Sequence, residues 1–119
     1  MNPPSGTVLV VDDDAAIRLL CRINLELDGW IVREADSVAR AREELDAEAI
    51  RAVLLDVHLG NESGVAFLAE LKRNHPDVRV ALLTGTVDAP TLDGTTPDAV
   101  IVKPFRLEEL LETVRAIAG

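Results

Sequence analysis

The sequence predicts an α/β fold in which five parallel strands form one sheet that helices cover on both faces. Short runs rich in Leu, Val and Ile alternate with amphipathic stretches along the whole chain. The chain has 119 residues, which fits a single domain spanning 1–119. Only 3% of the residues are aromatic, so we expect a core built from Leu, Val, Ile and Ala.

Five short apolar runs are predicted to be the strands. Each is too short for a buried helix and is rich in β-branched residues, Leu or Ala, which is typical of strands covered on both faces. In chain order they cover residues 7–11, 30–35, 52–55, 78–83 and 99–102.

Amphipathic stretches predict four helices, which cover residues 14–28, 38–47, 63–73 and 106–118. Asp14, Ser37 and Ser63 stand where a side-chain oxygen can cap the first turn of a helix. Residues 60–64 are expected to form a loop. The first helix is predicted to bury the side that carries Ile17, Leu20, Cys21 and Asn24.

The fourth strand–helix unit is irregular in sequence. Proline and glycine recur between Thr84 and Lys103, and both residue types destabilise the interior of a helix. We therefore expect a shortened or irregular fourth helix in this segment.

Charge and composition exclude several classes of function. The net charge is −9, from 12 basic and 21 acidic residues, which argues against direct binding to nucleic acid or to an anionic membrane. No stretch approaches the roughly 20 apolar residues of a membrane span. Cys21 is the single cysteine, so an intramolecular disulfide is excluded. The N-terminus does not resemble a signal peptide, and a cytoplasmic protein is expected.

Polar residues whose side chains can react or bind a metal follow four of the predicted strands. Asp12 and Asp13 follow the first strand, Asp56 the third, Thr84 the fourth and Lys103 the fifth. Ligands of open parallel sheets bind outside the carboxyl ends of the strands, so we expect these side chains to meet at one edge. Each residue alone is more often a turn, strand or surface residue, but their coincidence on four strand ends favours a site.

Such a group has the parts that phosphoryl transfer requires. Converging carboxylates repel one another, and Mg²⁺ relieves that repulsion because it takes oxygen ligands. A lysine adds positive charge, a threonine adds a hydroxyl donor, and a carboxylate can act as the nucleophile. His58 is near the predicted site and is interpreted as a loop residue without a catalytic side chain.

At these residues the sequence resembles the receiver domain of bacterial response regulators over essentially its whole length. The resemblance rests on the segments 8–14, 53–56, 82–85 and 102–105. It implies a flavodoxin-like, doubly wound sheet with strand order 2-1-3-4-5. It also implies a phosphoacceptor in two-component phosphorelay signalling rather than an enzyme.

The resemblance further implies roles for individual residues. Asp56 would accept the phosphoryl group, Thr84 would bind a phosphoryl oxygen, and Lys103 would pair with the phosphoryl group or with Asp56. Gly85 would leave room for that group, and the Lys103–Pro104 peptide bond would be cis.

A metal site is implied in the same way. Asp12 and Asp13 would hold Mg²⁺ together with Asp56, and His58 would offer its backbone carbonyl. The phosphoryl group would come from a histidine kinase, a phosphotransfer protein or a small phosphodonor.

Three features depart from the family pattern. Leu59-Gly60 replaces the usual Met-Pro, Val100 replaces an aromatic residue, and the segment after Thr84 is short and broken. The last two fall on the face that reports phosphorylation in the family. We therefore expect phosphorylation to change mainly the order of residues 86–98, and the final helix to change less.

Three alternatives remain open at this point. A small phosphatase of the haloacid dehalogenase type also uses an aspartate nucleophile with Mg²⁺, although 12–16 lacks its characteristic threonine. A flavodoxin-like cofactor binder would need a hydroxyl-rich phosphate loop after the first strand. The chain is also compatible with a receiver module excised from a larger hybrid kinase or regulator.

Overall fold

The computed structural model describes residues 6–85 and 94–119, and its centre is a five-stranded parallel sheet. The sheet order is β2-β1-β3-β6-β7, which is 2-1-3-4-5 when only these five strands are counted, as predicted. The strands are β1 (Thr7–Val11), β2 (Ile31–Ala35), β3 (Ile50–Asp56), β6 (Arg79–Thr84) and β7 (Ala99–Val102).

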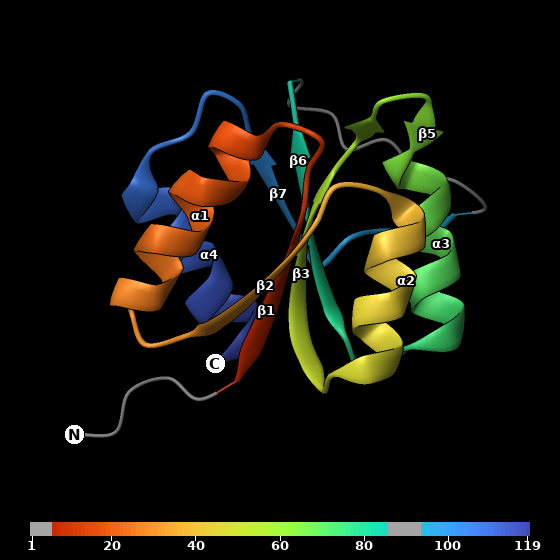
Figure 1. Cartoon of the computed structure of the whole chain (residues 1–119), viewed down its shortest axis with the longest axis horizontal. Coiled ribbons are helices and arrows are strands. Elements are labelled where there is room, and N and C mark those ends of the chain that lie inside the picture. The colour runs from red at the N-terminus through yellow and green to blue at the C-terminus, as the bar shows by residue number, and fades with distance from the viewer. Residues whose placement is uncertain (1–5, 86–93) are drawn as a thin grey trace.

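Two pairs of helices cover the two faces of the sheet (Figure 1). One face carries α1 (Ala15–Leu27) and α4 (Leu107–Ala118), and the other carries α2 (Val38–Ala47) and α3 (Gly64–Asn74). Each face has its own apolar core, because alternate side chains of every strand point to opposite sides. The doubly wound fold predicted from the sequence is confirmed.

The first three helices begin at the predicted capping residues. Asp14, Ser37 and Ser63 have extended backbones, and each side chain accepts a hydrogen bond from a backbone N–H two or three residues further on. These bonds satisfy donors that have no partner inside the helix. The local sequence therefore sets where each helix starts relative to the strand before it.

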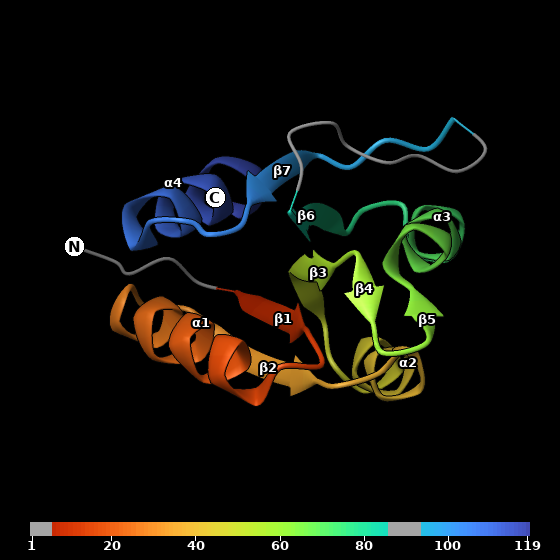
Figure 2. The same cartoon turned by 90° about the horizontal axis from the view of Figure 1, so that it is seen from above.

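A short hairpin follows β3, where the sequence predicted only a loop. Its strands β4 (His58–Leu59) and β5 (Glu62–Ser63) pair in antiparallel fashion. Gly60 turns the chain with a φ of 63°, and the side chain of Leu59 is buried in the core under α2 and α3. Figure 2 shows β4 and β5 beside β3. The buried side chain of Leu59 anchors the hairpin there.

The buried side of α1 agrees with the prediction at Ile17, Cys21 and Asn24, which are buried or half-buried, and differs from it at Leu20. Cys21 and Leu25 are buried and Ile17 is half-buried, whereas Leu20 is 41% exposed. Arg18, Arg22 and Glu26 form one polar side of the helix, and the apolar residues cover an arc wider than the sheet can bury, so the periodicity did not determine which of them face the sheet. We call the exposed apolar residues of this helix the α1 stripe: Leu19, Leu20, Ile23 and Leu27.

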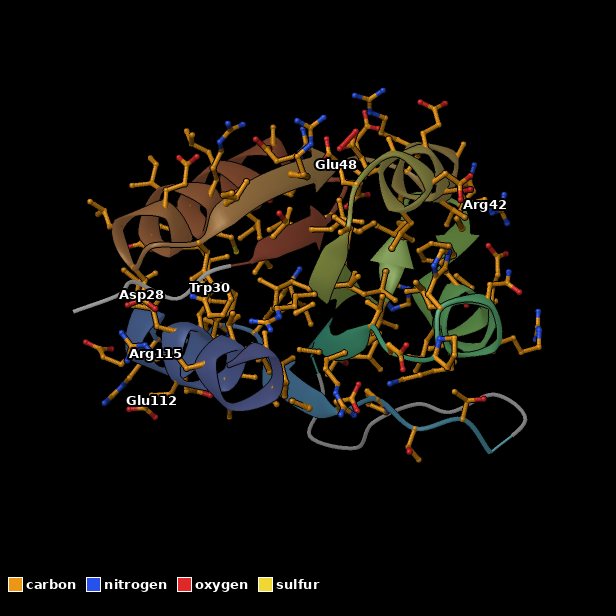
Figure 3. All side chains as sticks on the ribbon, turned by 90° about the horizontal axis from the view of Figure 1, so that it is seen from below. Asp28, Trp30, Arg42, Glu48, Glu112 and Arg115 are labelled. Carbon is orange, nitrogen blue, oxygen red and sulfur yellow. The ribbon has the colours of Figure 1, made fainter. Side chains whose placement is uncertain are left out.

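At the edge opposite the β4–β5 hairpin, an ion pair joins α1 to α4 (Figure 3). Arg115 of α4 donates two hydrogen bonds to the carboxylate of Asp28, and the indole N–H of Trp30 donates a third at 3.2 Å. The bonds from Arg115 hold the pKa of Asp28 below its usual range. This contact fixes the C-terminal end of α1 against the last helix.

The segment between β6 and β7 is described only in part. Residues 94–98 contain no helix, and residues 86–93 lie outside the described residues. The predicted short or irregular fourth helix, and the predicted ordering of residues 86–98, therefore stay predictions for the segment as a whole. None of the helices within 6–85 and 94–119 combines the length and apolarity needed to cross a membrane.

Candidate functional site

Three carboxylates meet at the carboxyl edge of the sheet. Asp12 and Asp13 follow β1, and Asp56 ends the neighbouring strand β3. One oxygen from each carboxylate lies within 4.8 Å of the others. Asp12 is fully buried and Asp56 is 8% exposed, whereas Asp13 is open to solvent. The parallel pairing of β1 with β3 brings these side chains together.

Lys103 extends from the end of β7 to two of these carboxylates. Its Nζ lies 3.1 Å from Oδ2 of Asp12 and 3.5 Å from Oδ1 of Asp56. Its backbone N–H donates to the carbonyl of Thr84 at 2.7 Å, and the Lys103–Pro104 bond is cis, as predicted. Burial disfavours the charged lysine. The hydrogen bond that Lys103 donates to Asp12 and the charges of Asp12 and Asp56 outweigh this effect, so the pKa of Lys103 is raised.

Asp56 is held in an environment that disfavours its charge. Burial is the largest cause, the nearby charge of Asp12 is the second, and together they raise the pKa of Asp56 above its usual value. Lys103 and the backbone N–H of His58, which lies 3.3 Å from Oδ1, oppose the shift without cancelling it. The site therefore has an excess of negative charge that a cation would relieve.

Asp12 is positioned by contacts on all sides. Its Oδ1 accepts from the backbone N–H of Asp14 at 2.9 Å, and its Oδ2 accepts from Lys103. Arg18 of α1 donates to its backbone carbonyl at 2.7 Å. Oxygen ligands grouped in this way fit a hard divalent cation such as Mg²⁺, which binds one or two carboxylates and keeps several waters.

Thr84 and Gly85 lie beside the carboxylates on the next strand. Asp56 pairs in register with Leu83, so Thr84 stands one residue further along β6 and is 6% exposed. A β-carbon added to Gly85 would meet no atom of residues 6–85 or 94–119 within 4 Å. Space for a small group therefore exists next to the hydroxyl-bearing residue.

His58 lies in β4, and its side chain is exposed. Within the described residues, its imidazole is not part of the carboxylate group, which consists of Asp12, Asp13 and Asp56. Its backbone is closer to the site, since its N–H donates to Asp56. The predicted role of its carbonyl stays a prediction.

Two glycines contact the site in ways that the sequence did not predict. The N–H of Gly60 donates to Oδ2 of Asp13 at 2.9 Å. Gly64, the first residue of α3, packs so closely that an added β-carbon would overlap the carbonyl oxygen of Asp56. The sequence offered one signal for Gly64. It is a glycine directly after the capping Ser63, at a position where a helix does not require glycine.

Comparison with known proteins identifies relatives. The family profile described as the response regulator receiver domain matches residues 8–115. Sensor kinase CckA of Brucella abortus is 33% identical over 93% of this chain and 12% of its own length. Response regulator MprA of Mycobacterium ulcerans is 32% identical over 95% of this chain and 50% of its own length. The chain spans half the length or less of these curated relatives.

Solved structures agree with this assignment. The receiver domain of NtrX from Brucella abortus is 29% identical with a TM-score of 0.84, and covers 93% of this chain and 97% of its own. Response regulator TrrA from Thermotoga maritima, solved in complex with Mg²⁺-BeF, is 27% identical with a TM-score of 0.84. The match covers 94% of this chain and 98% of the TrrA chain. The chain belongs to the response regulator receiver domain family of two-component signalling.

Proposed function

We propose that this domain accepts a phosphoryl group on Asp56 with Mg²⁺ bound beside it. Asp12, Asp13 and Asp56 would hold the metal through carboxylate oxygens, and His58 would add its backbone carbonyl. The observation that carries the proposal is the group of three carboxylates within 4.8 Å of one another, with the Lys103 ammonium 3.5 Å from Asp56. These are the charges that phosphoryl transfer needs around an oxygen nucleophile.

The proposed reaction is an in-line displacement at phosphorus. An oxygen of ionised Asp56 forms the new O–P bond while the bond from phosphorus to the donor breaks, and the donor leaves with that electron pair. Lys103 neutralises charge on the phosphoryl oxygens, and the Thr84 hydroxyl donates a hydrogen bond to one of them. Mg²⁺, when held by Asp12, Asp13 and Asp56, would supply further positive charge at this site.

The product would be an acyl phosphate on the protein itself. Water would later attack phosphorus and restore the Asp56 carboxylate, so the domain would reset without acting on an external ester. We therefore propose that this is a signalling domain that modifies itself, and that it is not an enzyme acting on an external substrate. Membership of the receiver family does not favour the phosphatase alternative.

The direct test uses phosphoramidate as the phosphodonor. With Mg²⁺ present, we expect the intact mass of the domain to rise by one phosphoryl group. A chelator should prevent the increase. A phosphoryl mass that appears equally fast without divalent cation would contradict the proposal.

Replacing Lys103 by alanine is expected to separate metal binding from chemistry. Removing the ammonium takes a competing cation away from Asp12 and Asp56, so Mg²⁺ should bind at least as tightly as in the parent protein. Phosphorylation should slow by roughly two to three orders of magnitude, because a preorganised charge at the phosphoryl oxygens is lost. Calorimetry gives the affinity and intact mass gives the rate.

An arginine at the same position serves as the control for Lys103. It keeps the positive charge but not the geometry of the ammonium, so an intermediate rate is expected. Unchanged phosphorylation of Lys103→Ala would remove this residue from the mechanism.

We propose a histidine kinase or phosphotransfer protein as the physiological donor, which fits the membership in two-component signalling. The α1 stripe is proposed as its docking surface. This helix starts at its cap Asp14, two residues after Asp12, so a partner on its outer face lies next to the acceptor edge. Exposed apolar residues on an otherwise strongly acidic domain favour an apolar helical partner surface.

A double variant, Leu19→Gln with Ile23→Gln, tests this docking surface. Transfer from the cognate kinase should slow by about tenfold, corresponding to roughly 1.4 kcal/mol of lost docking energy, while phosphoramidate should react as before. Ile31→Gln is the matched control, because Ile31 is 62% exposed but lies on β2. Equal slowing with both donors would show damage to the site rather than loss of docking.

The larger context of the domain is also a proposal. We propose that residues 1–119 form one receiver module located in the cytoplasm, where kinases have access to nucleotide and Mg²⁺. The curated relatives carry further sequence beyond the matched part, so the output of this protein would come from partners or from additional domains.

A further inference from the structure

We infer that Gly60 is a positioning residue that prepares Asp13 for binding Mg²⁺, an inference that rests on the proposed function. The Gly60 N–H donates to Oδ2 of Asp13 at 2.9 Å, across 47 positions of sequence. A carboxylate has two oxygens, so one can accept this bond while the other is offered to a metal. Hydrogen bonds of this kind to ligating carboxylates orient them and strengthen metal binding.

Asp13 is the carboxylate that most needs such support. Asp12 is fully buried and accepts from Asp14 and Lys103, and Asp56 is nearly buried. Asp13 is exposed, and within residues 6–85 and 94–119 the bond from Gly60 is the one hydrogen bond its side chain accepts. Without it, the side chain would populate several rotamers, and metal binding would have to oppose that freedom.

The hairpin geometry explains why this position carries glycine. Gly60 has a φ of 63°, in the left-handed region that glycine adopts without strain. The flanking Leu59 is buried, which fixes the direction of the turn and therefore of the N–H. Proline, the residue that the receiver family usually has at this position, has no N–H and could not adopt this φ, so the bond to Asp13 is a feature of this chain that comes with its departure from the family pattern.

The same hairpin contacts a second carboxylate of the site. The N–H of His58 donates to Oδ1 of Asp56 at 3.3 Å, two residues before Gly60 donates to Asp13. The hairpin thus contacts one carboxylate from the end of β3 and one from the loop after β1. The spacing between these two carboxylates therefore depends on the hairpin as well as on the sheet.

Calorimetric titration with Mg²⁺ tests the inference through two variants of one position. Gly60→Pro removes the N–H, and its Mg²⁺ affinity should fall by about tenfold. Gly60→Asn keeps the N–H and tolerates a positive φ, so its affinity should stay within about twofold of the parent value. Equal or tighter binding by Gly60→Pro would overturn the inference.

An NMR measurement on the unmodified hairpin avoids any effect of the proline on folding. In Asp13→Ala, the Gly60 amide proton should move upfield and exchange with solvent faster than in the parent protein, because its acceptor is gone. An unchanged Gly60 resonance would overturn the inference.

Different results would refute the metal site and the role of Gly60. Absence of Mg²⁺ binding by the parent protein would refute the proposed metal site and this inference together. Normal Mg²⁺ binding by the parent and by Gly60→Pro would refute only the role of Gly60.

Discussion

An Asp56→Asn variant is expected to lose phosphorylation completely and yet to be more stable than the parent protein at neutral pH without metal. The amide cannot act as the nucleophile, so no phosphoryl mass should appear with phosphoramidate and Mg²⁺. The gain in stability follows from burial and the charge of Asp12, which raise the pKa of Asp56. Folding with an ionised Asp56 costs free energy, and this cost is absent when a neutral amide stands at position 56.

The sign of the pH dependence follows from the same shift. The folded state keeps the Asp56 proton to higher pH than the unfolded chain does, so the free energy of unfolding falls as pH rises from the ordinary aspartate range through the raised pKa. In urea unfolding, Asp56→Asn should therefore have a higher free energy of unfolding than the parent protein at neutral pH. The difference between the two proteins should be smaller in mild acid. Mg²⁺ should stabilise the parent but not the variant.

Asp46→Asn is the matched control for this experiment, because Asp46 is exposed on α2. Its stability should follow the parent protein at every pH. A parent protein more stable than Asp56→Asn at neutral pH without metal would contradict the electrostatic description of the site.

Gly64→Ala is expected to be the most disruptive addition of a single methyl group near the site. The new β-carbon would overlap the carbonyl oxygen of Asp56 and lie 2.9 Å from Cα of Val57. Both contacts are with backbone, so no side chain can rotate away, and α3 must move from β3. We expect a loss of roughly 3 kcal/mol in the free energy of unfolding, at the upper end for overpacking.

Urea unfolding measures this loss, and Gly85→Ala is its control. A β-carbon on Gly85 meets nothing within 4 Å in the part of the chain that the structure describes, so its effect on stability should stay within about 0.5 kcal/mol. The Gly64 variant should also phosphorylate more slowly, because the backbone that carries Asp56 is displaced. Equal stability of the two variants would show that α3 moves freely relative to β3.

The sequence was sufficient to predict the sheet and the place of the candidate site. Strand order came from the resemblance to receiver domains, and the strands themselves came from short apolar runs. The positions of Asp12, Asp13 and Asp56 could be predicted to converge because parallel strands present their carboxyl ends at one edge.

Features that depend on side-chain packing or on backbone direction could not be predicted. The apolar residues of α1 cover an arc wider than the sheet can bury, so nothing local distinguished buried Leu25 from exposed Leu27. The β4–β5 hairpin depends on a buried Leu59 and on the positive φ of Gly60, neither of which has a periodic signal. Gly64 matters through a contact with the backbone of β3, which is visible only once both elements are in place.

The central claim is that Asp56 itself carries the phosphoryl group, and chemical trapping tests it most directly. The domain would be treated with phosphoramidate and Mg²⁺ and then with borohydride, which reduces an aspartyl phosphate to homoserine. Peptide mass spectrometry then locates the modified residue. We expect homoserine at position 56 and at no other aspartate. Homoserine at position 12 or 13, or a phosphoryl group that resists borohydride because it sits on another residue type, would contradict it.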